Sequence, residues 1–309
     1  MPFPYLIFGL GLGILLQKYF PVGTLPGVLG TQLEKMESQL NRLFKTGPYN
    51  LQSGIPPEFQ GQLSLIILAG QSNMSGADKV PKSSQNTNLR VFVFGNNYRW
   101  RIAREPIDDP KGQVDKVFED LKAGYSPGTA FANSLVSRSQ HMVIGLIPCV
   151  KWGSSIHEWQ RNLSENSLYG SCLKRVRAAS TMGKVAGLLF FQGESDALDP
   201  RKYPKKKLSP NNWSDKFVSF ANDLRRDLSE PNLPVVFAQI GNHRDLDKLI
   251  NWKIVQDQQK NVKLPNSAMI TTSDLALKDH VHLTAESSQI IGERFASAFW
   301  DLIQGQINE

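Results

Sequence analysis

Residues 68–76 (LAGQSNMSG) follow directly on the apolar run at residues 64–68 (SLIIL), and this junction decides the fold class. The run is short and rich in Leu and Ile without polar alternation, which is typical of a buried parallel strand. A strand that ends in glycine and continues into a polar turn places the next serine at the carboxyl edge of the sheet. Open α/β sheets bind their ligands at that edge. Ser72 is therefore a candidate nucleophile.

A serine nucleophile needs a base, and the candidates lie far downstream at residues 278–284 (KDHVHLT). Asp279 and His282 are three residues apart, so one tight loop can bring the carboxylate to Nδ1 and leave Nε2 for Ser72. His280 is the rival base, but it is adjacent to Asp279 and folds back onto it less easily. Taken singly, a turn serine more often bonds the local backbone, and an Asp-x-x-His pair is more often a solvated loop. Together they predict a Ser-His-Asp hydrolase.

Four segments in order resemble the sequence blocks of one family, the SGNH hydrolases of the sialate O-acetylesterase and carbohydrate esterase family 6 (acetylxylan esterase-like) type. They are residues 70–74 (GQSNM), 147–159 (IPCVKWGSSIHEW), 190–197 (FFQGESDA) and 279–284 (DHVHLT). The resemblance extends over roughly residues 63–300. It implies a serine esterase that removes O-acetyl groups from a carbohydrate and needs no cofactor.

The resemblance also implies a role for particular residues. Ser72 matches the family's nucleophile, and Asp279 and His282 match its acid–base pair. The oxyanion hole matches the backbone N–H groups of Ser72 and Gly153 and the side-chain amide of Gln192. Three donors aimed at a developing oxyanion are what acyl transfer requires. Glycine suits position 153 because the backbone must approach the oxyanion closely.

Further residues of the blocks are expected to support the site. These are Gln71 and Asn73 beside the nucleophile, and Glu194 as a buried organiser of the site loops. Trp152 replaces the first glycine of the second block, so it is either a possible substrate contact that stacks on a sugar or a packing residue. Glu194 and Asp196 are close in sequence, but no His or Cys with ligand spacing lies nearby, so no metal site is expected.

The rest of the chain predicts a three-layer α/β/α sandwich with a central parallel sheet, of the flavodoxin-like kind. Polar inserts at residues 79–88, 96–125 and 199–212 are expected to be loops that shape the substrate cleft. A helix at residues 284–303 should begin with Thr284 as its N-cap. Strands are expected at residues 65–68, 89–94, 142–147, 185–191, 235–240 and 268–272, and further helices at residues 129–137 and 213–228.

The N-terminal part differs from this domain, which spans residues 63–309. Residues 1–30 form a hydrophobic segment whose apolar run at 4–16 (PYLIFGLGLGILL) is shorter than the about 20 residues of a comfortable spanning helix. We expect an uncleaved membrane anchor first, a secretory signal second and a buried helix third. Residues 31–62 comprise an amphipathic helix (31–45) and a linker. Basic residues after the segment favour a cytoplasmic domain, whereas a polysaccharide substrate favours the outside.

Composition limits the partners. The 309-residue chain has a net charge of +7 and a pI near 9.3. The basic run at residues 202–207 (KYPKKK) is commonly just a solvated loop, but it could also meet an acidic polysaccharide or anionic lipid headgroups. No motif for nucleic acid is evident. The two cysteines, Cys149 and Cys172, are interpreted as buried thiols, since a single bridge requires that they meet in space.

Two other function classes remain open. A lipid-directed or general-ester hydrolase of the GDSL-like kind would suit the hydrophobic segment and the basic run. A non-catalytic carbohydrate-binding protein on the same fold is opposed by the presence of Ser72, Asp279 and His282.

Overall fold

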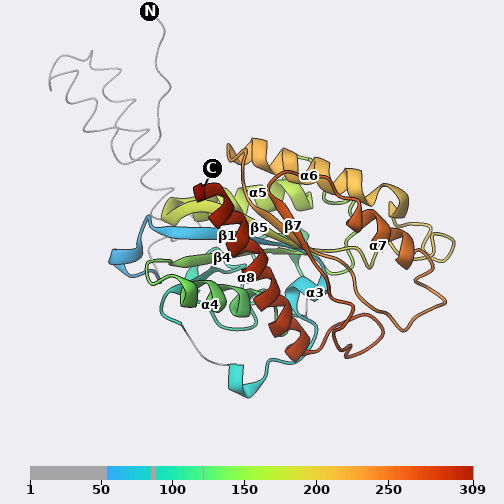
Figure 1. Cartoon of the computed structure of the whole chain (residues 1–309), viewed down its shortest axis with the longest axis horizontal. Helices are drawn as coiled ribbons and strands as arrows, with labels where there is room; N and C mark the ends of the chain where they lie inside the picture. The colour runs from blue at the N-terminus through green and yellow to red at the C-terminus, as the bar shows by residue number, and fades with distance from the viewer. Residues whose placement is uncertain (1–53, 85–87, 121, 309) are drawn as a thin grey trace, which may run out of the picture. The chain divides into compact units, whose positions relative to one another are not determined.

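The computed structural model describes residues 54–84, 88–120 and 122–308 (Figure 1). The predicted anchor at residues 1–30 and the amphipathic helix at 31–45 lie outside these residues. Of the predicted linker, residues 54–62 are described, and they contain one turn of 3₁₀ helix, Pro57–Phe59. Among the described residues, no helix has both the length and the apolar character needed to cross a membrane.

Within the described part of the chain, seven strands form one sheet in the order β3-β2-β4-β1-β5-β6-β7. All neighbouring pairs are parallel except β2 and β3. β1 lies between β4 and β5, and seven of its eight residues are buried, which explains its unbroken apolar sequence. The strands are β1 (Leu63–Gly70), β2 (Val91–Phe94), β3 (Trp100–Ile102), β4 (Ile144–Val150), β5 (Gly183–Phe191), β6 (Val235–Ala238) and β7 (Ser267–Ile270).

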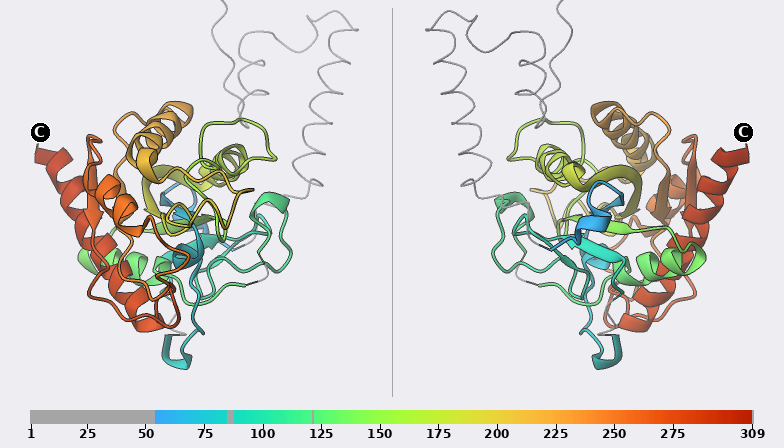
Figure 2. Two further views of the ribbon diagram at one scale, coloured as in Figure 1. Left: turned by 90° about the vertical axis from the view of Figure 1, so that its right-hand side faces the viewer. Right: turned by 90° about the vertical axis from the view of Figure 1, so that its left-hand side faces the viewer.

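Helices cover both faces of the sheet, and the predicted three-layer sandwich is confirmed. α4 (Gly128–Arg138) and α8 (Ala285–Asn308) pack together on one face, and α5 (Leu168–Ala179) and α6 (Trp213–Leu228) pack together on the other. Figure 2 shows these two layers at either side of the strands. α7 (Trp252–Lys260) contacts α6, and the short α3 (Ser72–Ser75) follows β1 directly.

The predicted helices at residues 129–137, 213–228 and 284–303 are found close to their expected bounds, but the apolar side chains of the last one do not all lie on its buried face. In α8, Ile291, Phe295 and Phe299 are buried as the apolar pattern requires, but Ile290 is 39% exposed. Ile290 lies about 100° around the helix from Ile291, outside the stripe that meets the sheet. Thr284 caps α8 as predicted, because its Oγ1 accepts the N–H of Ser287 at 3.2 Å.

The edge strand β3 was not predicted, because it lies inside the insert at residues 96–125 that was expected to be only loop. Its Trp100 is buried, while Arg101 and Ile102 are half-buried. Three residues are too few for a periodic pattern to be recognised in sequence. The other inserts, at residues 79–88 and 199–212, contain only short 3₁₀ turns among their described residues.

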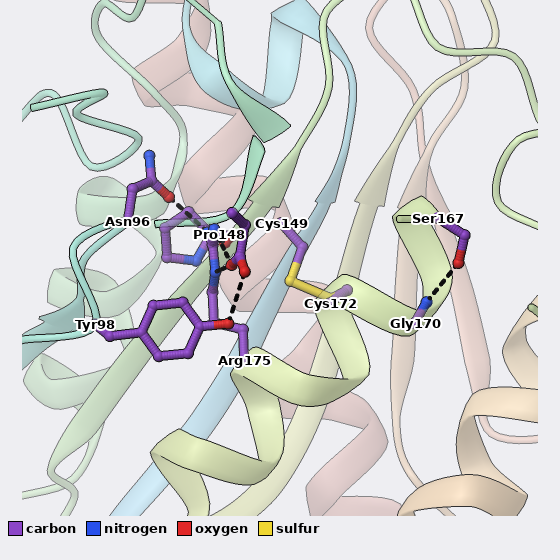
Figure 3. The surroundings of a disulfide bond; sticks show 9 residues. Asn96, Tyr98, Pro148, Cys149, Ser167, Gly170, Cys172 and Arg175 are labelled. Carbon is purple, nitrogen blue, oxygen red and sulfur yellow. Dashed lines mark hydrogen bonds and ion pairs between the residues drawn. A yellow bond between two sulfur atoms is a disulfide. The ribbon is translucent and has the colours of Figure 1, made fainter. Parts of the chain in front are cut away.

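The interpretation of Cys149 and Cys172 as buried thiols is wrong, because the two residues form a disulfide (Figure 3). Cys149 is the penultimate residue of β4, and Cys172 lies in the second turn of α5. α5 packs against β4, so residues 23 apart in sequence meet with their Cα atoms 5.5 Å apart. The bridge fastens the carboxyl end of β4 to the helix layer, within the second sequence block and four residues before Gly153.

Candidate active site

Ser72 lies at the first position of α3, immediately beyond β1. The turn requires glycine at position 70, because a Cβ there would lie 2.1 Å from the carbonyl oxygen of Phe191 and the φ angle is +137°. Ser72 is only 4% exposed. As the first residue of a helix, it has a backbone N–H without an intrahelical acceptor.

The structure brings Ser72, His282 and Asp279 into one hydrogen-bonded chain. Ser72 Oγ lies 3.0 Å from Nε2 of His282, and Nδ1 of His282 lies 2.8 Å from Oδ2 of Asp279. Oδ1 of Asp279 accepts the N–H groups of Val281 and His282. His280, the rival base, is exposed, and its backbone carbonyl accepts the N–H of Arg244.

These hydrogen bonds keep the Asp279 carboxylate ionised. Partial burial raises its pKa, but the N–H groups of Val281 and His282 and the imidazole of His282 outweigh burial and lower the pKa to about 2. An ionised acceptor at Nδ1 fixes the tautomer of His282 that leaves Nε2 as the acceptor for the Ser72 hydroxyl.

Asn73 and Glu194 join the nucleophile turn to the histidine loop. The side chain of Asn73 donates to Oε1 of Glu194 at 2.6 Å and to the carbonyl of Val281, and it accepts the N–H of Leu283. It therefore grips the chain on both sides of His282. Glu194 is buried, and burial raises the pKa of its carboxyl. Among the described residues, Oε2 of Glu194 has no hydrogen-bond partner.

The loop after β4 brings Gly153 to the site. Gly153 has a φ angle of +68°, a left-handed conformation that favours glycine. Its N–H has no acceptor among the described residues, whereas the N–H of Trp152 donates to Oδ2 of Asp120 at 2.7 Å. The ring of Trp152 packs on the ring of His282, with 5.4 Å between centroids. Its indole N–H is buried and has no partner in the described part of the chain.

Gln192 lies beneath this loop and is fully buried. Its Nε2 donates to the carbonyl of Ser154 at 2.9 Å and to Oδ2 of Asp196 at 2.8 Å, and its Oε1 accepts from the indole N–H of Trp213. Gln71 Oε1 lies 3.4 Å from the same Nε2. Both hydrogens of the Gln192 amide are thus engaged, and donation to an oxyanion requires that it give up one of them.

Asp196 connects three segments of the chain. Its carboxylate accepts the N–H groups of Ile156 and Ser209 and the amide of Gln192. Burial raises its pKa to about 6 despite these bonds. Among the described residues, no cluster of three or more His, Cys, Asp or Glu side chains is arranged to hold a metal ion.

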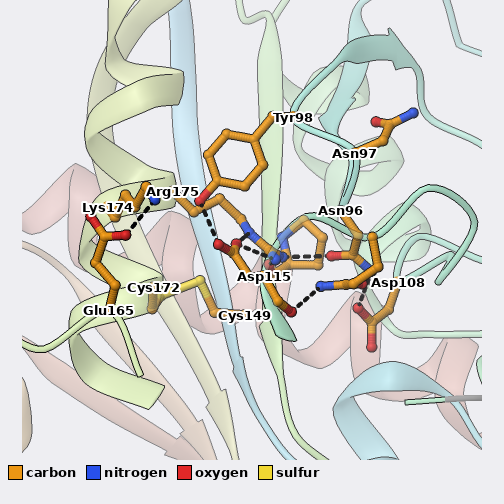
Figure 4. A network of polar contacts seen from close by, with 12 residues as sticks. Asn96, Asn97, Tyr98, Asp108, Asp115, Cys149, Glu165, Cys172, Lys174 and Arg175 are labelled. Atoms are coloured by element: carbon orange, nitrogen blue, oxygen red, sulfur yellow. Dashed lines mark hydrogen bonds and ion pairs between the residues drawn. A yellow bond between two sulfur atoms is a disulfide. The ribbon is translucent and has the colours of Figure 1, made fainter. Parts of the chain in front are cut away.

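The insert at residues 96–125 is anchored by a buried ionic network around Arg175 of α5 (Figure 4). The fully buried guanidinium donates to Oδ2 of Asp115 at 2.7 Å, to Oδ1 of Asn96 at 2.5 Å and to the carbonyl of Pro148. Asn96 in turn donates to Asp108. The same side chain therefore ties the insert to the end of β4, close to where the loop of Gly153 begins.

Sequence reasoning missed two residues that contact this loop. Asp120 lies in a polar insert that contains no recognisable motif, so nothing in the sequence marks it. Lys206 belongs to the basic run, which is expected to be a solvated loop or to meet an acidic polysaccharide or anionic lipid headgroups, yet its Nζ donates to the carbonyl of Gly153 at 2.6 Å. The one signal in the sequence is the position of the basic run within the insert at residues 199–212, which is expected to shape the substrate cleft.

Comparisons with known proteins identify the family of this chain. The family of carbohydrate esterases described as sialic acid-specific acetylesterases matches residues 62–301. A probable carbohydrate esterase of Arabidopsis thaliana is 32% identical over 270 residues, which are 81% of this chain and 93% of that protein. An X-ray structure of an Arabidopsis thaliana protein has a TM-score of 0.65 and 28% identity, covering 78% of this chain and 98% of that one.

Two more distant structures share the fold. A carbohydrate acetylesterase of Xanthomonas citri has a TM-score of 0.59 and 18% identity, covering 78% of this chain and 56% of that one. NanS has a TM-score of 0.58 and 15% identity, covering 80% and 99%. The family match and the Arabidopsis relative decide the assignment. The chain belongs to the carbohydrate esterase family of sialic acid-specific acetylesterases, which are carboxylic ester hydrolases of the SGNH fold.

Proposed function

We propose that this protein removes O-acetyl groups from a carbohydrate through an acetyl-enzyme formed on Ser72. The observation that carries the proposal is the unbroken chain from Asp279 through His282 to Ser72, with contacts of 2.8 and 3.0 Å at the carboxyl edge of the sheet. Residues 210 apart in sequence have no structural need to meet with an imidazole nitrogen against a hydroxyl. General-base activation of a serine does need that contact.

The reaction follows from these positions. His282 takes the Ser72 proton at Nε2 as Oγ attacks the acetyl carbonyl, and Asp279 stabilises the imidazolium. His282 then donates this proton to the sugar oxygen as the bond between that oxygen and the acyl carbon breaks, so the sugar leaves with a free hydroxyl. A water molecule, activated by the same histidine, attacks the acetyl-enzyme and releases acetate.

The oxyanion of the tetrahedral intermediate would be bound by backbone amides. The N–H groups of Ser72 and Gly153 lack acceptors in the described part of the chain and belong to the two loops that meet at Ser72. Gln192 holds the Ser154 carbonyl and would join them by exchanging that bond. Removing one oxyanion donor typically costs about 10²- to 10³-fold in turnover.

A short acyl group suits the surroundings of the serine. Ser72 is 4% exposed, and the indole of Trp152 lies against His282. An acetyl group requires little room beside Oγ, whereas a long acyl chain requires a groove. The bulkier part of the substrate would then be the alcohol, and the relatives' names indicate a carbohydrate.

The test is hydrolysis of 4-nitrophenyl acetate, butyrate and octanoate by the purified full-length protein and by Ser72→Ala. We expect acetate to be cleaved best and the variant to lose about 10³-fold or more. Acetylated sialic acids and acetylated xylan oligosaccharides would then be compared by acetate release. A preference for octanoate would indicate a lipid-directed hydrolase. Equal inactivity of both proteins towards every ester and glycan would leave a binding protein.

We further propose that residues 1–30 attach the protein to a membrane and that the domain faces an oxidising compartment. The disulfide between Cys149 and Cys172 supports the second point, because such bonds persist outside the reducing cytosol. Alkylation of thiols in the protein isolated without reductant is the measurement. Modification of both cysteines before reduction would contradict the oxidising compartment.

A further inference from the structure

The loop that carries the Gly153 N–H is held from both sides by charged side chains that lie outside the four sequence blocks. On one side, Asp120 accepts the N–H of Trp152 at 2.7 Å. On the other side, Lys206 donates its ammonium to the carbonyl of Gly153 at 2.6 Å. Asp120 comes from the insert at residues 96–125, and Lys206 comes from the insert at residues 199–212.

These two contacts act on the peptide groups that flank one particular peptide. The Gly153 N–H belongs to the peptide that joins Trp152 to Gly153. The preceding peptide is held through its N–H by Asp120, and the following peptide is held through its carbonyl by Lys206. With both neighbours fixed, the peptide between them can reorient only by a concerted change of the ψ angle of Trp152 and the φ angle of Gly153. A glycine with a φ angle of +68° is intrinsically permissive, so restraint must come from outside it.

Each of the two charged residues is itself anchored. Asp120 also pairs with Lys151 at 3.1 Å, and the network around Arg175 secures its insert. The insert of Lys206 is fixed on either side, since Asp196 accepts the N–H of Ser209 and the N–H of Asp199 donates to the carbonyl of Lys248. The ammonium of Lys206 is therefore presented by a restrained loop, although its side chain is exposed.

We infer that Lys206 and Asp120 are positioning residues that clamp the oxyanion loop and set the direction of the Gly153 N–H. This inference rests on the proposed function, because it assigns the clamp to the oxyanion of the same reaction. It also gives a specific role to one lysine of the basic run. The neighbouring Lys205 is exposed and carries the same charge, but it makes no hydrogen bond or ion pair with the loop in the described structure.

The experiment compares Lys206→Met with the matched control Lys205→Met, using 4-nitrophenyl acetate and the full-length protein. A donor aligned only for the transition state affects kcat more than KM. We expect Lys206→Met to lower kcat about 10-fold with KM changed less than about twofold. Lys205→Met should keep both constants. The rate at which paraoxon phosphorylates Ser72 should fall in parallel with kcat, because its phosphoryl oxygen occupies the same oxyanion site.

Asp120 supplies a second arm with a conservative rescue. Asp120→Ala removes the acceptor of the Trp152 N–H and should lower kcat about 10-fold, whereas Asp120→Asn keeps an acceptor oxygen and should restore kcat to within about threefold. Thermal unfolding of each variant separates misfolding from misalignment.

Equal loss in Lys205→Met and Lys206→Met, confined to KM, would overturn the clamp and indicate that the run acts only through its summed charge. Unchanged kcat in Lys206→Met would also overturn it. Neither outcome contradicts the proposed function, which is tested separately by the activity of Ser72→Ala and by the preference of the wild-type protein for acetate over octanoate esters.

Discussion

The side of the site that carries the proposed nucleophile and the side that carries the proposed oxyanion donor are held in place by different means. Ser72 and His282 are joined through Asn73 and Glu194, buried residues that belong to the sequence blocks themselves. The loop of Gly153 is held by charged side chains from inserts that belong to no block. The difference indicates that residues of the sequence blocks position Ser72 and His282, whereas inserts outside the blocks align the proposed oxyanion donor.

The largest loss of turnover is expected for Asp279→Asn. An amide at this position permits the wrong tautomer of His282, and the expected loss in kcat is about 10⁴-fold. Hydrogen bonds lower the pKa of Asp279 to about 2, so its carboxylate is charged above that pH. The negative charge is lost only as the pH falls through about 2. A pH–rate profile from pH 4 to 9 should therefore contain no step from Asp279. Near-normal turnover in the variant would contradict the proposed triad.

Asn73→Ala tests the connection between Ser72 and His282, the proposed nucleophile and base. It removes the bonds to the loop of His282 and leaves Glu194 buried without its donor, at a cost of about 1–3 kcal/mol. Without these bonds the loop can shift, and His282 is then misplaced relative to Ser72. We therefore expect kcat to fall about 10- to 100-fold. Glu194→Gln keeps an acceptor for Asn73 and should lose less. Full activity of Asn73→Ala would show that His282 is held by other contacts.

The disulfide between Cys149 and Cys172 allows stability and turnover to be tested separately on the side of the Gly153 loop. Replacing both Cys149 and Cys172 by alanine should lower the free energy of unfolding by about 3 kcal/mol, because the bridge closes a segment of 23 residues. Turnover should change less than about threefold, since Arg175 still bonds the carbonyl of Pro148 at the end of β4. Urea unfolding and ester hydrolysis give the two readouts. A loss of turnover well above threefold in the folded variant would place the bridge among the residues that align the loop.

The smallest effect on turnover is expected for Asp108→Asn, in the network that anchors the first insert. Burial raises the pKa of Asp108 to about 6, above the value of about 3.8 for the unfolded chain. Its contribution to stability is therefore full below about pH 4 and is lost as the pH rises through about 6, by roughly 3 kcal/mol. In the variant this decline should shrink, although Asp196 still contributes one of its own. Urea unfolding at pH 4, 5, 6 and 7 measures it, and an unchanged decline would contradict the assignment.

The sequence was informative where the pattern was local. Unbroken apolar runs marked six of the seven strands found in the described residues, and the four blocks marked the residues that meet around Ser72. The pattern failed where a contact depends on tertiary placement. Cys149 and Cys172 could pair only once α5 was known to pack on β4, and the three residues of β3 are too short to show a period. Asp120 and Lys206 carry no motif, because an exposed loop can supply a charge from almost any position in sequence.

The hydrogen bond between Ser72 and His282 also has a consequence for how the enzyme is made. It joins residues 210 apart in sequence, so a ribosome completes the proposed nucleophile long before it reaches the proposed base. At about 5–20 residues per second, the delay is roughly 10–40 s. Throughout that time the emerging chain holds a serine without a partner that can activate it, and a chain that terminates early stays inert. Esterase activity would thus report that synthesis of the domain has reached its last helix.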